Sequence, residues 1–197
     1  MSYGIYSLNS PILISDAAIV RNFEGRRDVL VIARGSLLQF YSLEGGFTLR
    51  YEYRLFGDVA RIIPLKHRDD AQANILLILR DLRYSIIRFS TSKSSIKTVQ
   101  SGNIESSTGV ALDPPFRVAV SSVALLLQVH QQVLQYFQIN SNSQLGPPVN
   151  YSIPAKYIID FDFMSSDDLT RFAVLTEDFG QTTKLQIFEV DPLTSRS

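Results

Sequence analysis

The sequence predicts an all-β fold, specifically part of a WD40-like β-propeller, from three observations. Residues 28–43 (DVLVIARGSLLQFYSL) combine an apolar run, a turn around Gly35 and an alternating run, which is the pattern of a β-hairpin with a more deeply buried first strand. The same pattern recurs along the chain. Helix-period apolar patterns are missing, while Phe, Tyr and β-branched residues, which favour strands, are common.

The hairpin pattern recurs at residues 74–90, 116–139 and 172–190, so that the starts at 28, 74, 116 and 172 lie 46, 42 and 56 residues apart. Four-stranded propeller blades repeat about every 40–50 residues, which favours a propeller with about four blades. We attribute the wide third spacing to a loop at residues 140–148 (NSNSQLGPP). A β-sandwich or barrel of short strands is the alternative.

Further strand-like segments lie between the hairpins. The first of these, at residues 12–23, would place Ala17, Ile19 and Arg21 on one face. The clearest half-buried strand is the second, in which Phe47, Leu49, Tyr51 and Tyr53 alternate with polar residues; we expect these side chains to share the buried face. In chain order these strands are expected at 12–23, 47–53, 59–65, 96–100 and 157–163.

The segments that join these strands are rich in Gly, Ser, Asn, Pro or charge, as turns and loops are. Residues 101–109 are expected to be mobile, and residues 113–115 (DPP) should end a strand at 110–112. Loops are also expected at 66–73, 90–95, 140–148 and 165–168.

The composition excludes several classes of function. The chain has 197 residues, a formal net charge of +0 and no cysteine. Disulfides, thiolate metal sites and cysteine nucleophiles are therefore excluded. The chain also lacks the excess of basic residues that would indicate electrostatic binding of nucleic acid by the protein as a whole. Because no signal peptide or spanning apolar run is visible, we expect a soluble intracellular protein with no membrane partner.

The two histidines are the first candidates for chemistry. His67 lies in a charged segment beside Asp69 and Asp70, yet no further ligands stand at metal-site spacing, so we interpret it as part of a solvated loop. His130 lies among glutamines between two strands, where a turn or edge residue is a better interpretation than a general base.

Paired carboxylates are the second candidates. Asp160 and Asp162 alternate on a strand and therefore point to one face, where they could perform acid–base catalysis. Phe161 and Phe163 would form the opposite apolar face, and a half-buried strand accounts for the pattern without catalysis. Asp167 and Asp168 fit an ordinary turn, with no calcium-loop spacing around them.

Arginines near the first hairpin are the third candidates, with tyrosines that could stack on bases of a single-stranded nucleic acid. Acidic residues are interleaved with them, which favours an ordinary surface of mixed charge. The arginines are Arg21, Arg26, Arg27, Arg34, Arg50, Arg54 and Arg61, and the tyrosines are Tyr41, Tyr51 and Tyr53.

Motifs for nucleophilic catalysis and for phosphate binding are absent: the sequence contains no G-x-S-x-G, G-x-G-x-x-G or G-x-x-x-x-G-K. We therefore expect a protein that is not an enzyme, that uses no cofactor and that has no small-molecule substrate. No residue is assigned a catalytic, metal-binding, cofactor-binding or partner-binding role.

An ordered series of short segments resembles the N-terminal region of the DDB1/CPSF-A/Mms1 family. The damaged-DNA-binding protein 1 branch is the most similar, because the opening is short and long insertions are missing. The matching residues are Leu30–Ala33 with Leu38–Tyr41, Leu55–Gly57 with Ile62, Leu76–Leu79 with Tyr84 and Ile87, and Asp113 and Pro114 with Arg117.

This resemblance implies the first, seven-bladed propeller of a large nuclear scaffold that links a cullin-4 ubiquitin ligase to substrate receptors in DNA repair. Its alternative is a nucleic-acid-associated subunit of a splicing or mRNA 3′-end cleavage complex from the same family. Family members are many times longer, and Val123–Val129 replaces a more polar aromatic segment. We therefore expect residues 1–197 to form one partial first propeller, a truncated or fragmentary member whose contact with nucleic acid is indirect.

Overall fold

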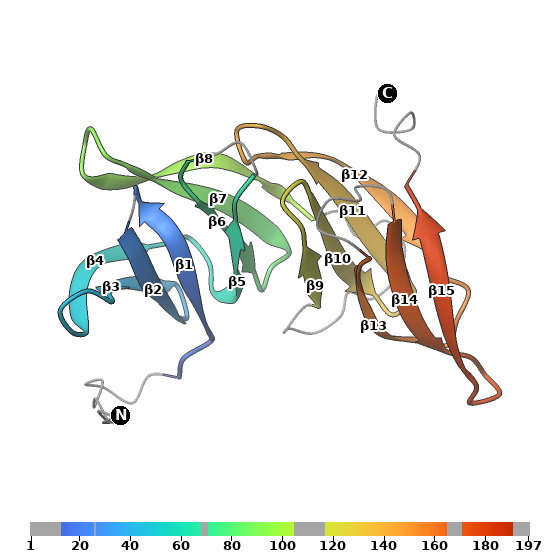
Figure 1. Cartoon of the computed structure of the whole chain (residues 1–197). Coiled ribbons are helices and arrows are strands. Elements are labelled where there is room, and N and C mark those ends of the chain that lie inside the picture. The colour runs from blue at the N-terminus through green and yellow to red at the C-terminus, as the bar shows by residue number, and fades with distance from the viewer. Residues whose placement is uncertain (1–12, 26, 68–70, 105–116, 165–170, 191–197) are drawn as a thin grey trace.

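The computed structural model describes residues 13–25, 27–67, 71–104, 117–164 and 171–190. Over these ranges the chain forms fifteen β-strands and no helix, which confirms the predicted all-β class. The strands make four antiparallel sheets that follow one another along an arc (Figure 1). No helix long and apolar enough to cross a membrane occurs in these ranges.

Each sheet is built from consecutive strands, and each strand pairs with the next one in the chain. The first sheet contains β1 (Asp16–Glu24), β2 (Arg27–Arg34), β3 (Leu37–Ser42) and β4 (Thr48–Arg54). The second contains β5 (Val59–Leu65), β6 (Asn74–Leu79), β7 (Arg83–Ser90) and β8 (Ser95–Asn103). The third contains β9 (Val118–Val120), β10 (Ala124–His130), β11 (Val133–Ile139) and β12 (Leu145–Ser152). The fourth contains β13 (Tyr157–Phe163), β14 (Arg171–Glu177) and β15 (Thr183–Glu189).

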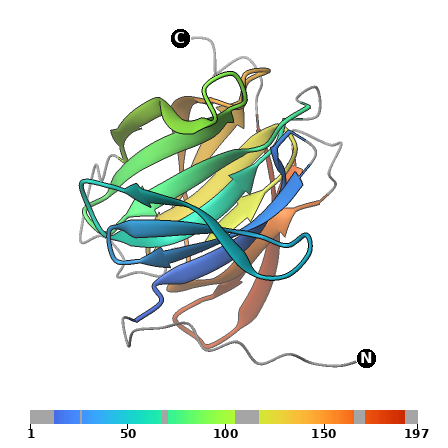
Figure 2. The same cartoon turned by 90° about the vertical axis from the view of Figure 1, so that its left-hand side faces the viewer.

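Four meandering sheets of three or four strands are the blades of a partial propeller, as the repeat predicted. Viewed from the side of the first sheet, the sheets lie one behind another with their faces together (Figure 2). The recurring hairpin supplies the two central strands of the first three sheets and strands β14 and β15 of the fourth. All residues of β6 and β10 are buried, because both faces of a central strand are covered by neighbouring sheets.

The predicted start of the third repeat at Phe116 is wrong. Phe116 lies outside the described residues, Val118–Val120 form the short first strand of the blade, and its central hairpin begins at Ala124. The four central hairpins then begin at residues 27, 74, 124 and 171, which are 47, 50 and 47 residues apart. The apolar β9 runs almost directly into β10, so the sequence pattern merged two strands into one.

The predicted loop at residues 140–148 is also wrong in its second half, because β12 begins at Leu145. Pro147 and Pro148 are tolerated there since β12 is the outermost strand of its sheet, where a missing backbone N–H breaks no inner pairing. Likewise, Ser101–Asn103 belong to β8 rather than to a mobile loop. The strand predicted at 110–112 lies outside the described residues.

Burial along β4 differs from the simple alternation expected for 47–53. Phe47 and Leu49 are 45% and 43% exposed, whereas Tyr51 and Tyr53 pack against the buried cluster between the first two sheets. The pairing shifts between Phe40 and Tyr41, so that one extra residue of β4 is accommodated and the alternation changes phase.

Neighbouring sheets are held together by three apolar clusters. Between the first and second sheets, the rings of Phe23 and Phe40 stack with centroids 5.4 Å apart, and Phe89 packs beside them. Aliphatic side chains such as Leu76 and Leu125 fill the space between the second and third sheets. Between the third and fourth sheets, Phe172 contacts Tyr151 and Phe188.

Candidate functional site

The two histidines are buried rather than solvated. His67 is 7% exposed, and its backbone N–H donates to Ser143 Oγ of the third sheet at 3.2 Å. The predicted solvated loop is therefore wrong, because a turn 76 residues away covers this segment. His130 ends β10 opposite Val133, next to a tight turn as predicted, but it is only 6% exposed.

Asp160 and Asp162 do share one exposed face of β13, and the intervening Phe161 is buried, as a half-buried strand requires. Each carboxylate accepts a hydrogen bond from the backbone N–H of the following residue, at 3.0 Å and 2.8 Å. In the ranges that the structure describes, no group of three His, Asp or Glu side chains could hold a metal ion. Asp167 and Asp168 lie outside those ranges.

Three of the arginines near the first hairpin are buried or paired with acidic residues. Arg34 is 8% exposed, and Tyr51 and Tyr53 pack into the interior. Arg27 forms an ion pair with Glu44 at 3.6 Å, and Arg61 with Asp16 at 3.8 Å. Arg26 lies outside the described residues. The surface of mixed charge is therefore the better description of this region.

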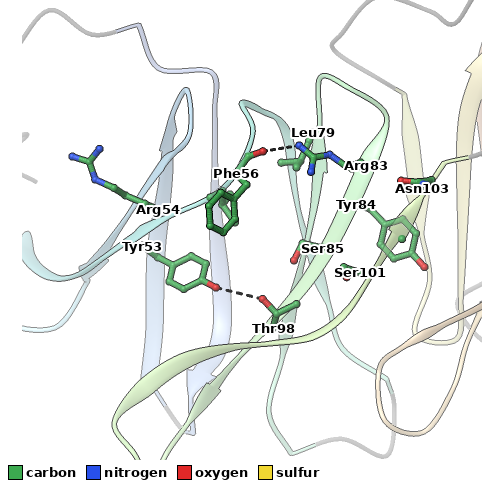
Figure 3. Close-up of a pocket in the computed structure, with 12 residues that line it drawn as sticks. Tyr53, Arg54, Phe56, Leu79, Arg83, Tyr84, Ser85, Thr98, Ser101 and Asn103 are labelled. Carbon is green, nitrogen blue, oxygen red and sulfur yellow. Dashed lines mark hydrogen bonds between the residues drawn. The ribbon is translucent and has the colours of Figure 1, made fainter.

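A cleft of about 370 Å³ lies between the first and second sheets (Figure 3). The first sheet contributes the end of β4 and the connection that follows it, with Tyr53 and Phe56. The second sheet contributes one face of β7 and β8, whose side chains are small and polar: Ser85, Thr98, Ser101 and Asn103. Tyr53 Oη and Thr98 Oγ1 lie 3.3 Å apart and join the two walls.

Phe56 stands at the mouth of this cleft with 95% of its side chain exposed. The connection that carries it is fixed on both sides: Leu55 N donates to Ser36 O at 2.9 Å, and Val59 N donates to Gly35 O at 2.9 Å. These bonds tie residues 55–59 to the turn between β2 and β3. The phenyl ring is therefore held out into solvent by a fixed backbone.

Arg83 closes the second wall. Its Nη2 donates to Phe56 O at 2.6 Å and forms an ion pair with Asp81 at 2.5 Å. The side-chain hydrogen bond from Arg83 lowers the pKa of Asp81, and the same bond raises the pKa of Arg83. Gly57 leaves room for this arrangement, because a Cβ there would lie 3.2 Å from the guanidinium.

Tyr84 lies at the edge of the cleft but packs toward the third sheet. Burial raises the pKa of its hydroxyl, which accepts a hydrogen bond from Gln100 Nε2 at 3.2 Å. The same Gln100 amide donates to Leu145 O at 2.9 Å and accepts from Leu145 N at 2.8 Å, so this corner belongs to the contact with β12.

The chemistry of the cleft is that of recognition. It offers an exposed aromatic ring, a tyrosine and an arginine, which are residue types enriched at protein–protein contacts, together with hydroxyl and amide groups that can form hydrogen bonds. The sequence analysis missed this site; the only signal was Leu55–Gly57, a turn that contains a large apolar residue.

In a comparison with protein families, a family model described as RSE1/DDB1/CPSF1 first beta-propeller matches residues 14–195. The match spans all four sheets and includes the whole cleft. A search of curated proteins gives no match.

Proposed function

Because the chain belongs to the RSE1/DDB1/CPSF1 first β-propeller family, we propose that it is a non-enzymatic scaffold whose cleft between the first two sheets binds a protein partner. The family supports a scaffold role, and the propeller fold supplies the rigid frame for it. The cleft is the part of this frame that carries a recognisable contact site.

The observation that carries the proposed site is Phe56. A phenylalanine that is 95% exposed loses the hydrophobic stabilisation that burial would give it, about 1.5–3 kcal/mol, and a bound partner would restore it. Its backbone is already fixed by the hydrogen bonds of Leu55, Val59 and Arg83, so binding orders little additional chain. An exposed aromatic next to an arginine is a typical anchor of an interface.

More specifically, we propose that the protein is an adaptor of the cullin-4 ubiquitin ligase type that acts in the nucleus and contacts substrate receptors. The short opening and the lack of long insertions, which favour the damaged-DNA-binding protein 1 branch, support this assignment. Leu55–Gly57, one of the segments that resemble the family as a whole, carries the anchor Phe56. Contact with nucleic acid would then be indirect, since Arg34 is buried and Arg27 is paired with Glu44.

A second candidate is a subunit of a splicing or mRNA 3′-end cleavage complex. The same family match favours it, because its description groups RSE1 and CPSF1 with DDB1. In that case the cleft keeps its role and the partner belongs to the RNA-processing complex.

The test is quantitative capture of partners from nuclear extract with the full tagged chain, its Phe56→Ala variant and its Phe179→Ala variant. Phe179, which is 81% exposed between β14 and β15, is a matched control far along the chain from the cleft. We expect Phe56→Ala alone to lose the specific partners. Recovery of ligase receptors supports the adaptor, and recovery of RNA-processing subunits supports the second candidate. Equal recovery by all three proteins would refute the cleft as the binding site.

A further inference from the structure

The outer edge of β8 beside the cleft carries backbone groups that pair with no other strand. β8 is the outermost strand of the second sheet and pairs only with β7 in the part of the chain that the structure describes. Ile104 N donates to Leu82 O at 2.7 Å, which fixes the hydrogen-bonded positions of this ladder. Counted back from that pair, Ser101 and Asn103 stand at non-hydrogen-bonded positions, so their backbone N–H and C=O groups point away from β7.

This stretch of edge is not blocked in the way that the neighbouring edges are. Towards the other end of β8, Val99 O already accepts a hydrogen bond from Gln144 Nε2 at 3.1 Å. The outermost strand β12 contains Pro147 and Pro148, which have no N–H to donate, and the outermost strand β4 (TLRYEYR) carries charged side chains at alternate positions. Prolines and charges keep edge strands from pairing with other chains. The stretch at residues 101–103 (SGN) has neither, so it can accept another strand.

The same residues form a wall of the cleft. Ser101 and Asn103 line it together with Leu79, across from the ring of Phe56 (Figure 3). A strand added to this edge would continue the second sheet outward. Because side chains alternate between the two faces of a sheet, every second side chain of the added strand would face the cleft and the exposed phenyl ring.

The two arginines that line the cleft are not placed to bind an anionic ligand. Arg83 already pairs with Asp81 and donates to Phe56 O. Arg54 directs its guanidinium away from the ring of Phe56 (Figure 3). The groups left for a ligand are therefore backbone amides, hydroxyls and apolar surface, which match a neutral polypeptide segment.

We propose that β8 binds an extended peptide segment of a partner protein by strand addition. The peptide backbone pairs with the outward N–H and C=O groups of Ser101 and Asn103, and an apolar side chain of the peptide lies in the cleft against Phe56. This inference rests on the proposed function, because it names how the partner occupies the same cleft. Main-chain pairing supplies affinity, and the cleft selects the side chain that faces it.

The probe is a phage-displayed library of random linear peptides, selected on the full chain. Peptides that bind the wild type and not Phe56→Ala are kept, and their dissociation constants are measured by calorimetry. Ser101→Pro and Asn103→Pro each remove one outward N–H and leave the pairing with β7 in place. We expect each variant to weaken peptide binding about tenfold, because a hydrogen bond is lost and a peptide carbonyl stays unpaired.

Glu52→Pro is the matched control on the edge of β4. Leu55 N donates to Ser36 O, so the same counting places the Glu52 N–H outward at an edge that the peptide does not use. This variant should bind the peptide like the wild type. Circular dichroism shows whether each proline variant is folded.

N-methylation of the peptide, one residue at a time, tests the pairing without any change to the protein. Methyl groups at alternate peptide residues should abolish binding, and those between them should be tolerated, because only every second N–H of an added strand faces β8. A Phe56-dependent peptide that shows no such alternation and binds both proline variants normally overturns strand addition, while the cleft stands as the binding site. A library that yields no Phe56-dependent peptide also overturns it, and capture from nuclear extract then decides the proposed function by itself.

Discussion

The junction between the first and second sheets and the junction between the second and third sheets use the same face-to-face packing but end differently at the surface. At the first, the core is rich in aromatic rings. The outer rim of this junction, where the outermost strands β4 and β8 lie, opens into the cleft beside Phe56. At the second, Gln144 and Leu145 form hydrogen bonds with Val99 and Gln100, so the chain at the start of β12 is joined to the outermost strand β8. The difference shows that packing of the blades alone does not make a binding site; the rim must also be left open.

The closed junction depends on polar side chains that reach across it. Asn74, which is fully buried, donates to Ser143 O at 3.1 Å and accepts from Arg88 Nε at 2.6 Å. Arg88 Nη2 also donates to Asn142 O at 3.0 Å. At the open junction, Asp16 Oδ2 accepts from Ile62 N at 2.8 Å, near the inner strands β1 and β5, and leaves the outer rim uncovered.

The largest expected effect is on the aromatic core of the open junction. Phe40→Ala removes a fully buried ring that stacks on Phe23, and we expect it to lower the free energy of unfolding by about 3–5 kcal/mol. Urea denaturation measures this change, and Phe47→Ala, at a half-exposed ring, is the control. A loss below about 1 kcal/mol would mean that the first two sheets do not depend on this cluster.

Asn74→Ala should have the next largest effect, because it removes the buried amide that links β6 to the turn of the third sheet. The carbonyl of Ser143 and the guanidinium of Arg88 lose a partner, and we expect a cost of about 2–3 kcal/mol. Asn150→Ala, at an exposed position of β12, should cost less than about 0.5 kcal/mol in the same denaturation experiment. Equal effects of the two variants would contradict the role of the Asn74 amide in holding the second and third sheets together.

Gly102→Ala tests the corner where the cleft meets the closed junction. A Cβ at residue 102 would lie 2.8 Å from the Tyr84 ring, so the ring must move and the hydrogen bond from Gln100 weakens. We expect a loss of about 1 kcal/mol. Gly146→Ala, where the nearest atom is Gln138 O at 3.4 Å, is the matched control. A Gly102→Ala variant that matches this control would show that the ring moves without cost.

The smallest effect concerns pH at the open junction. The hydrogen bond from Arg83 lowers the pKa of Asp81 in the folded protein below 3.8, so this interaction stabilises the fold above that pH and is lost as pH falls through the lowered pKa. Asp81→Asn should therefore reduce the loss of stability on acidification. Thermal unfolding between neutral and acidic pH measures it. An unchanged pH profile in Asp81→Asn would show that solvent screens the pair completely.

The fold was largely predictable because each blade has a recognisable sequence pattern within one short segment of the chain. Residues 28–43 contain both central strands of the first sheet, and their pattern recurs in every other sheet. What the sequence did not reveal depends on residues far apart in the chain. The burial of His67 comes with its contact to Ser143, and Phe56 is held in solvent by the hydrogen bonds that tie residues 55–59 to the turn between β2 and β3. Sequence periodicity can report neither of these contacts.

The errors in strand limits have the same origin. Pro147 and Pro148 normally indicate a loop, but the outermost place of β12 in its sheet, which is a property of the whole blade, allows them in a strand. Asp160 and Asp162 were correctly placed on one face. That Asp160 lies opposite Leu175 and Asp162 opposite Ala173 required the structure.

The consecutive order of strands in every sheet has a consequence for how the protein is made. Because β1–β4 are contiguous in sequence, the first sheet can form its pairing as soon as residue 54 has left the ribosome, without waiting for any later segment. Each later sheet then forms on the exposed face of the one before it. We therefore expect the sheets to fold one after another during synthesis. At each stage the most recently formed sheet exposes the apolar face that the next sheet will cover.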